Sequence, residues 1–430
     1  MKSEKIEAIS FLSKYGMYHG DIDFIVEVDK FVDEMERGLA GQGSLQMIPT
    51  YLGLDNLQYS DENVIVIDAG GTNFRVALGR FNERQAPVFD EYAAYKMPGA
   101  DGARISSDEL FRQMADLVRP LSGKAERIGF CFSYPTDILS NRDGRVVRMT
   151  KGLDIVGCEG ELVGENLLAK LDAGPKRVSI LNDTVATLLG GVAAHRDRKF
   201  SSYCGMVLGT GYNMAYIEKA GNIIKDSEIA KSGGSMIINI EAGNYARAIR
   251  GEIDKIFNAK DKDPGVQTFE KMISGAYLGG MVLEVLKKAA EDGLFSVGFR
   301  KAIVDRVAPD SALLDEFLYR PDGDSFFAGL CADERDRLLV YYSISELLER
   351  TAKFVAIGIA AVVKKTGEGS NPLAPALFLA EGSTFYKSKT LKDRISAYIH
   401  KYLEREMGLY CEILGAGEVT FAGSLIAGLI

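Results

Sequence analysis

The chain has 430 residues, of which 47% are hydrophobic and 26% are charged, and its net charge is −9. This length predicts more than one domain, and this composition predicts globular domains with apolar cores rather than a disordered chain. Because an acidic protein offers little attraction to nucleic acid or to an anionic membrane surface, we expect neither as a partner. An anionic ligand would need a local cluster of backbone N–H groups and cations.

Cysteine usage and the N-terminal segment indicate the compartment. The five cysteines are odd in number, widely scattered and never spaced as Cys-x-x-Cys, which favours free thiols over a disulfide framework or a zinc site. The first twenty residues lack the apolar region of a secretion signal. No apolar run approaches the roughly 20 residues that span a bilayer. We therefore expect a cytoplasmic protein.

Hydrophobic periodicity in the first half of the chain predicts helices followed by strands with glycine-rich connections. Residues 1–50 have apolar residues at helical spacing, and glycines end that pattern. A strand, a Gly-Gly turn and a second strand are expected at 63–81. Another strand is expected at 128–139, ended by Pro135, and a strand that runs into a helix is expected at 177–195.

The second half of the chain begins with another strand, glycine-rich turn and strand, at 202–218. Long helical patterns cover 269–305 and 336–365. A last strand is expected at 376–383, and it leads into a helix over 384–405.

The strand–glycine turn–strand pattern therefore occurs twice, about one domain length apart. VIVIDAGGTNFRVAL begins at Val64, and GMVLGTGYNMAYI begins at Gly205. This similarity is too weak to establish a repeat, but it suits two related lobes that each present a glycine hairpin to a shared cleft.

Both glycine turns have features of a phosphate site. In DAGGTNFR (68–75), the two glycines let the backbone approach a ligand closely, and backbone N–H groups in such a turn suit phosphate oxygens. LGTGYN (208–213) supports the same interpretation. A plain β-hairpin without a ligand explains either turn about equally well. Neither turn is a P-loop or a Rossmann fingerprint.

A carboxylate stands at a strand-to-helix junction in ILNDTVATLLGG (180–191). Asp183 would begin the helix, where the helix dipole stabilises its charged form and leaves it able to accept a proton from a hydroxyl. Taken alone, an Asn-Asp pair before a helix is more often a cap. Both interpretations remain open on these residues.

In this order, these segments resemble the motifs of the hexokinase/glucokinase family of actin-like sugar kinases. The resemblance covers about 31–285, with a weaker tail at 336–385, and it is specific because many short motifs keep the family order. The further motifs that carry it are FVDEMERGLAGQGSLQMIPTYL (31–52), FSYPTD (132–137), MTKGLDIVGCEGELV (149–163), MIINIEAGNY (236–245) and FEKMISGAYLGG (269–280).

The sequence departs from the family pattern at several positions. Ala242 stands where the family has Trp, and Gly280 stands where many members have Glu. The adenosine-side Asp-Gly-Ser reads Glu381-Gly382-Ser383, and the C-terminal Gly-Ser-Gly-Lys-Gly stretch is not preserved. Residues 288–335 match no motif of the family.

The resemblance implies an α/β fold with two lobes, actin-like (ribonuclease H-like), with a ligand cleft between a small and a large lobe. The small lobe would span 61–182, with a C-terminal return near 416–430, and the large lobe would comprise 1–60 and 183–415.

The implied activity is ATP-dependent phosphorylation of a hexose at its 6-hydroxyl, with glucose as the expected hexose. Asp183 would be the general base, and Lys151 and Arg75 would offset charge on the transferring phosphoryl group. The residues expected around the sugar are Ser133, Thr150, Lys151, Asn182, Asp183, Asn213, Glu241 and Glu270. Those expected around ATP are Asp68, Gly70, Gly71, Thr72, Asn73, Arg75, Gly209, Thr210, Gly211, Gly382 and Ser383.

The implied cofactors are ATP and Mg²⁺, with Asp68 as an outer-sphere partner of the metal, because Mg²⁺ keeps most of its waters. The expected partners are therefore small molecules, and the oligomeric state is left open. Three alternatives also stay open: a kinase that prefers mannose, fructose or glucosamine, a hexokinase-like sugar sensor without turnover, and a chaperone- or actin-like ATPase.

Overall fold

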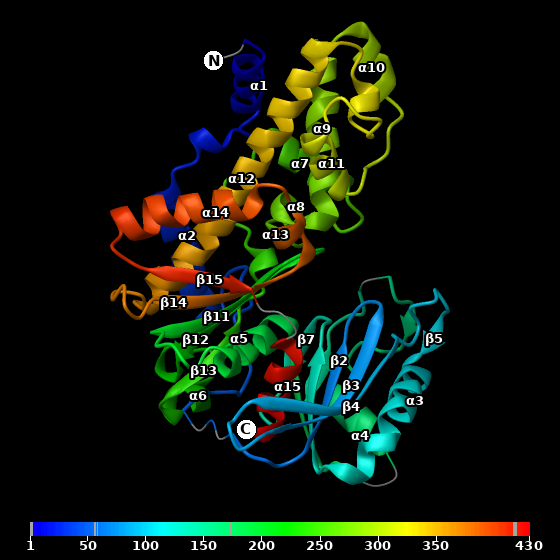
Figure 1. Ribbon diagram of the computed structural model, residues 1–430, viewed down its shortest axis with the longest axis vertical. Coiled ribbons are helices and arrows are strands. Elements are labelled where there is room, and N and C mark those ends of the chain that lie inside the picture. Colours follow the sequence, from blue (N-terminus) through cyan, green and yellow to red (C-terminus); the bar gives the residue numbers. More distant parts are fainter. Residues whose placement is uncertain (1–2, 56, 58, 151, 172–173, 416–418) are drawn as a thin grey trace.

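The computed structural model describes the whole chain except residues 1–2, 56, 58, 151, 172–173 and 416–418. Figure 1 shows an elongated molecule in which two sheets, each with its own helices, follow one another along the long axis. Within the described part of the chain, no helix has both the length and the apolar character needed to cross a membrane.

The first sheet has the strand order β10-β6-β2-β3-β4 among the described residues. Its strands are β2 (Val64–Ala69), β3 (Asn73–Phe81), β4 (Pro87–Lys96), β6 (Arg127–Phe132) and β10 (Arg177–Leu181). Alternate residues of β2 point to opposite faces, so Ile65 and Ile67 pack with α3 (Ser107–Val118) while Val64 and Val66 pack with residues of α15 (Val419–Leu429). Both faces are thus covered at β2, which pairs parallel with β6 and antiparallel with β3.

The second sheet has the order β1-β13-β12-β11-β14-β15 within the described ranges. Its strands are β1 (Ile48–Pro49), β11 (Ser202–Leu208), β12 (Tyr212–Lys219), β13 (Ser235–Asn239), β14 (Ala376–Glu381) and β15 (Cys411–Gly415). One face shares a core with α2 (Phe24–Leu39), α12 (Glu334–Thr366) and α14 (Leu391–Tyr398). The other face packs on α5 (Asp183–Ala194).

Helices α5 and α15 lie between the two sheets and join them (Figure 1). Glycines let the two helices approach closely. A Cβ on Gly423 would lie 1.9 Å from the carbonyl oxygen of Ala186, and a Cβ on Gly190 would lie 2.1 Å from that of Val419. Any side chain at either glycine would separate the helices, so this contact fixes how one lobe sits on the other.

A helical layer extends the second sheet at the end of the molecule far from the first sheet (Figure 1). It has its own core and consists of α1 (Ser3–Lys14), α7 (Glu252–Lys260), α9 (Gly275–Glu291), α10 (Val297–Ile303), α11 (Ala312–Tyr319) and the first half of α12. Most of residues 288–335, which match no family motif, lie in this layer.

The remaining short elements connect these layers. They are β5 (Ile105–Ser106), β7 (Thr136–Ile138), β8 (Gly144–Val146), β9 (Ile155–Val156), α4 (Val163–Ala169), α6 (Ser227–Ser232), α8 (Glu270–Ile273), α13 (Ser383–Lys387), 3₁₀ turns at His19–Asp21, Arg119–Lys124, Ala220–Asn222, Ala242–Asn244 and Ala328–Leu330, and a π-helical stretch at Ile399–Glu406.

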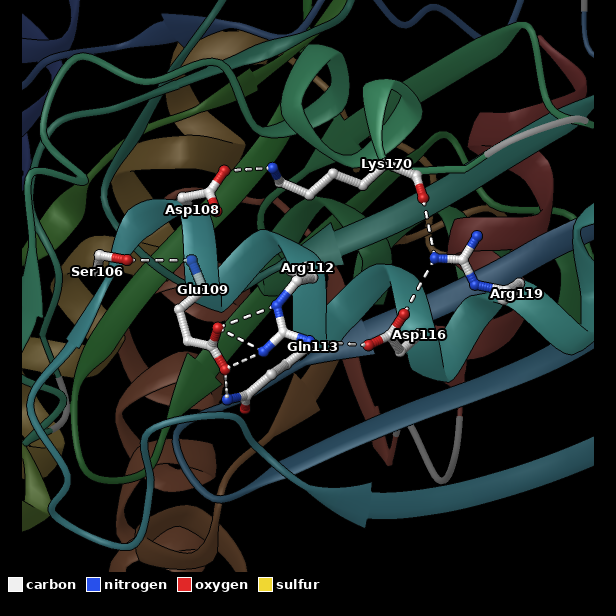
Figure 2. Close-up of polar contacts among 8 residues, drawn as sticks. All are labelled: Ser106, Asp108, Glu109, Arg112, Gln113, Asp116, Arg119 and Lys170. Atoms are coloured by element: carbon white, nitrogen blue, oxygen red, sulfur yellow. Dashed lines mark hydrogen bonds and ion pairs between the residues drawn. The ribbon is translucent and has the colours of Figure 1, made fainter.

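Figure 2 shows a polar network along α3 on the outer surface of the first lobe. Ser106 caps the helix by accepting the N–H of Glu109 at 3.2 Å, and the Arg112 guanidinium donates to the Glu109 carboxylate at 3.0 Å. Arg119 donates to the carbonyl of Lys170 at 3.1 Å, which ties α3 to the end of α4. Since exposed ion pairs contribute about 0–1 kcal/mol each, this network orients surface helices and bears little on the cleft.

Four secondary-structure expectations differ from the structure. The strand expected at 128–139 is two strands, β6 and β7, because the chain turns at Ser133–Pro135. β4 was not predicted, and β14 is not the last strand, since β15 follows it. The helix expected over 384–405 is interrupted between α13 and α14 and ends in the π-helical stretch.

Candidate active site

Asp183 is the first residue of α5, directly after β10, at the level where the two lobes meet. Asn182 is the N-cap residue, and its side-chain oxygen accepts the N–H and the hydroxyl of Thr184 at 2.9 and 2.7 Å. The Asp183 carboxylate also accepts the Thr184 N–H, at 2.8 Å. Because Asn182 already caps the helix, the cap interpretation does not account for the carboxylate of Asp183.

A network of amide side chains holds Glu241 near this junction. Asn213 donates to Asn239 at 2.7 Å, and Asn239 donates to the Glu241 carboxylate at 2.8 Å. Asn213 also lies 3.4 Å from the side-chain oxygen of Asn182 and accepts the N–H of Ala242 at 3.1 Å. Sequence reasoning missed Asn239, although its position two residues before Glu241 in MIINIE could have indicated it.

Glu241 has a left-handed backbone, with φ 57° and ψ 49°. A residue with a Cβ adopts this conformation at a cost, and such strain is concentrated at functional sites. Burial raises the pKa of the Glu241 carboxyl, the hydrogen bond from Asn239 opposes that rise, and the negative charge of Asp183 adds to it. The fold therefore holds this carboxylate in place against both strain and desolvation.

Glu270 begins α8 and contacts the second glycine turn. Its Oε2 accepts the backbone N–H of Tyr212 at 2.8 Å. Gly211 makes room for this contact, because a Cβ there would lie 2.7 Å from the same oxygen. Burial raises the pKa of Glu270 to about 7, against the effect of the Tyr212 N–H, and the negative charge of Glu241 raises it further.

The FSYPTD loop contacts the first glycine turn. The N–H of Ser133 donates to the carbonyl of Ala69 at 3.1 Å, and the hydroxyl of Tyr134 donates to the carbonyl of Gly70 at 2.7 Å. A small cavity lies between the lobes. Its lining includes Tyr134 on one side and Asn182, Asn239 and Glu241 on the other.

The structure does not describe every residue predicted around the sugar. Thr150 is half-buried, and Lys151 lies outside the described residues. Of the other predicted sugar residues, Asn182, Asp183, Asn213, Glu241 and Glu270 gather through the contacts above. Ser133 stays with the first glycine turn of the first lobe and is not among the residues that line the cavity.

In the first glycine turn, Asp68 and Arg75 bind each other. They are opposite one another in the β2–β3 register, and Arg75 Nε donates to Asp68 Oδ2 at 2.9 Å, with a second, shorter bond from the same guanidinium. The guanidinium also lies 5.4 Å from the centre of the Phe421 ring. Arg75 is thus held at the strand ends, next to the turn.

The tip of this turn is open to solvent. The N–H of Gly70 donates to the carbonyl of Asn73 at 3.0 Å and closes it. Thr72 and Asn73 are exposed, and Gly71 is half-buried. The tip therefore lies at the surface of the lobe, where a ligand could reach its backbone.

The second glycine turn is held from three sides. The N–H of Tyr212, directly after the turn, donates to Glu270, the hydroxyl of Thr384 donates to the carbonyl of Gly209 at 2.8 Å, and the N–H of Gly275 donates to the same carbonyl at 2.8 Å. A further bond of 3.1 Å runs from the N–H of Ala276 to the carbonyl of Thr210. These bonds fix the turn against the starts of α9 and α13.

Gly382 brings the start of α13 against this turn. Its φ is 110°, and a Cβ there would lie 2.3 Å from the carbonyl oxygen of Leu208. A Cβ on Gly209 would lie 3.3 Å from the Cα of Gly382. The structure therefore brings together Gly209–Gly211 and Gly382–Ser383, two predicted ATP segments about 170 residues apart in the sequence.

Glu381, just before Gly382, is a buried carboxyl that sequence reasoning treated only as a departure from the family motif. Thr420 of α15 donates to it at 3.2 Å. Burial raises the pKa of Glu381 to about 7, and the negative charges of Asp183 and Asp68 raise it as well. Three carboxylates from three elements thus face the same region. Among the described residues, no group of three or more His, Cys, Asp or Glu side chains is arranged to hold a metal ion directly.

Two family models, both described as hexokinase, match residues 21–193 and 203–429. Hexokinase-5 of Oryza sativa subsp. japonica is 31% identical over 388 residues, covering 80% of this chain and 73% of the relative. Hexokinase-1 of Schizosaccharomyces pombe is 30% identical over 414 residues, covering 88% of this chain and 82% of the relative.

Among solved structures, a hexokinase from Schistosoma mansoni complexed with glucose matches with a TM-score of 0.80 and 22% identity, covering 99% of each chain. This likeness confirms the predicted fold class, a two-lobed, actin-like α/β fold. Because the family models match residues on both sides of the cleft, and the relatives cover most of the chain, the protein belongs to the hexokinase family and is a sugar kinase that phosphorylates a hexose.

Proposed function

We propose that this chain transfers the γ-phosphoryl group of ATP to the 6-hydroxyl of a hexose, with glucose as the expected hexose and Asp183 as the general base. The observation that carries this proposal is the position of Asp183. Its carboxylate lies at the start of α5, close enough to Glu241, Glu270 and Glu381 for its negative charge to raise the pKa of each.

The carboxylates of Glu241 and Glu270 would bind the sugar. An ionised carboxylate accepts hydrogen bonds on two oxygens, so it can hold two neighbouring hydroxyls of a ring. Asn213 and Asn239 keep the Glu241 carboxylate in one orientation. A sugar fixed on this side would present its free hydroxyl to Asp183, which supplies the proximity that a reaction between two bound substrates requires.

Asp183 would accept the proton of the 6-hydroxyl as the oxygen attacks the γ-phosphorus. The bond to the β–γ bridging oxygen breaks, and ADP leaves with the bonding electron pair. Lys151, outside the described residues, would offset charge on the transferring group, and Arg75 would do so from near the start of β3 once its bond to Asp68 is shared with the phosphate.

The two glycine turns would bind the phosphates from opposite lobes through backbone N–H groups. The turn at Gly70–Asn73 is open, and the turn at Gly209–Gly211 lies against Gly382, so ATP would cross the cleft between them. ATP would arrive as its magnesium complex, in which Mg²⁺ neutralises phosphate charge. Asp68 fits an outer-sphere role, because it is buried and both bonds from Arg75 go to its Oδ2.

A cytoplasmic location is part of the same proposal. All five cysteines lie in the described part of the chain, and none of them forms a disulfide there. Reduced thiols are typical of proteins that work in a reducing compartment.

The test is ADP release by the purified protein with MgATP and a panel of glucose, mannose, fructose and glucosamine, coupled to NADH oxidation. We expect hexose-dependent ADP release, highest in kcat/KM for glucose. A higher kcat/KM for another hexose would reassign the substrate. Tight hexose binding without ADP release would identify a sensor, and ADP release that needs no sugar would identify a general ATPase.

A further inference from the structure

A contact across the cleft joins two loops on the sugar side that the proposed mechanism leaves unused. Arg148 follows β8 in the first lobe, and its Nη2 donates to the side-chain oxygen of Gln267 at 3.3 Å. Gln267 belongs to the second lobe and comes three residues before Glu270. Both side chains are half-buried. The contact thus connects the loop that leads to Thr150 with the loop that leads to a sugar-binding carboxylate.

The charge of Arg148 acts on both glutamates of the sugar site. Apart from burial and the hydrogen bond from Asn239, the pKa of Glu241 is raised by Asp183 and Asp137 and lowered by Arg148. Burial and the Tyr212 N–H have the two largest effects on the pKa of Glu270. Among nearby charges, Glu241 raises this pKa and Arg148 lowers it. Asp183 on α5 acts on this carboxyl too, in the same direction as Glu241. Arg148 is therefore a positive charge that opposes this acidic group.

The guanidinium is not committed to an ion pair elsewhere. Within the described part of the chain, no carboxylate lies within ion-pair distance of Arg148, and its guanidinium donates to the side-chain oxygen of Gln267. A half-buried arginine whose one side-chain partner is a neutral amide keeps its full charge available to nearby groups.

The geometry points to Arg148 as a positioning residue for the sugar, an inference that rests on the proposed function. Arg148 bridges the cleft through Gln267, and its positive charge favours the ionised forms of Glu241 and Glu270. Two carboxylates in one small, half-buried site repel each other, so one of them would otherwise take up a proton and lose an acceptor. The bridge also sets how far the sugar loops can separate.

Glucose binding, measured by isothermal titration calorimetry from pH 6 to 8 without ATP, tests this inference. R148M should weaken glucose binding about tenfold at pH 7 and move the pH below which binding weakens upward by about one unit, because the compensating charge is gone. R148K should keep the wild-type pH profile. Q267M should weaken binding less than R148M and leave the profile unchanged, since it removes the bridge and not the charge.

The matched control is R145M, three residues earlier on β8, where an exposed arginine is removed from the same segment. It should bind glucose as the wild type does. If R148M keeps wild-type affinity, or loses affinity without a shift of its pH profile, Arg148 has only a structural role and the inference is wrong. Failure of the proposed function is recorded separately, as absence of glucose-dependent ADP release by the wild type.

Discussion

The carboxylate of Glu270 accepts the backbone N–H of Tyr212 at 2.8 Å, directly after the glycine turn at Gly209–Gly211. One residue of the proposed sugar site thus holds the strand that carries a proposed phosphate turn. The proposed sugar site and the proposed phosphate turn therefore share one backbone contact. This relationship motivates the first prediction.

Gly211→Ala should impair sugar binding through Glu270. The added Cβ would lie 2.7 Å from the Glu270 carboxylate, so that side chain must move. We expect the KM for hexose to rise about tenfold or more, since a charge-assisted hydrogen bond contributes about 1.5–3 kcal/mol. Steady-state kinetics measures it. The control is Gly221→Ala, where a Cβ meets nothing within 4 Å, and wild-type kinetics of G211A would contradict the arrangement.

Sugar affinity should depend on pH through Glu270. Burial raises its pKa to about 7, and the protonated carboxyl loses one of its acceptor oxygens. If the ionised form binds, the Kd for glucose should be about tenfold larger at pH 6 than at pH 8. Calorimetric titration at several pH values measures this, and Glu270→Gln should give weaker binding with a flatter profile. A wild-type Kd that is independent of pH would mean that another group holds the sugar.

The same carboxyl should lower the stability of the sugar-free protein at high pH. A carboxyl whose folded pKa lies above its unfolded pKa binds more protons when folded, so its contribution to stability falls as pH rises from about 4.5 to about 7. Glu270→Gln should therefore raise the melting temperature by a few degrees at pH 8 and change it little at pH 5. Calorimetric melting curves check this, and an equal shift at both pH values would attribute the effect to packing.

Asp183→Asn should separate chemistry from binding. Asn is isosteric and keeps an oxygen for the Thr184 N–H, but it cannot accept a proton from a hydroxyl. We expect kcat to fall about 10²–10⁴-fold, with glucose affinity within a few-fold of the wild type. Single-turnover kinetics and calorimetric titration measure the two quantities. Near-normal turnover would show that Asp183 serves only the start of the helix.

Local patterns predicted much of the fold and of the candidate site. The two glycine turns and the strand–helix junction at Asp183 each depend on a few consecutive residues, so periodicity and turn residues could indicate them. The role of Asn239 could not be seen this way, because its bond to Asn213 depends on how β12 pairs with β13. β15 was missed because it is a short, half-buried strand with no alternation.

Sugar should also close the cleft. Ser133 and Thr150 belong to one lobe, and Glu241 and Glu270 belong to the other, so one sugar can bind all four only when the lobes approach. Closure excludes water, which otherwise competes with the 6-hydroxyl as the attacking group. The glycine contact between α5 and α15 keeps the lobes joined between the two sheets, which leaves the cleft as the part that can narrow.

Small-angle X-ray scattering measures this closure directly. The radius of gyration should fall when glucose is added without ATP, because binding energy for the correct sugar is used to assemble the site before phosphoryl transfer. ADP release without sugar should then be orders of magnitude slower than with sugar, since the open site lacks both the hydroxyl and the excluded solvent. An unchanged radius of gyration would show that the lobes do not close around the sugar. Equal rates of ADP release with and without sugar would show that water reaches the γ-phosphate as readily as the hexose does.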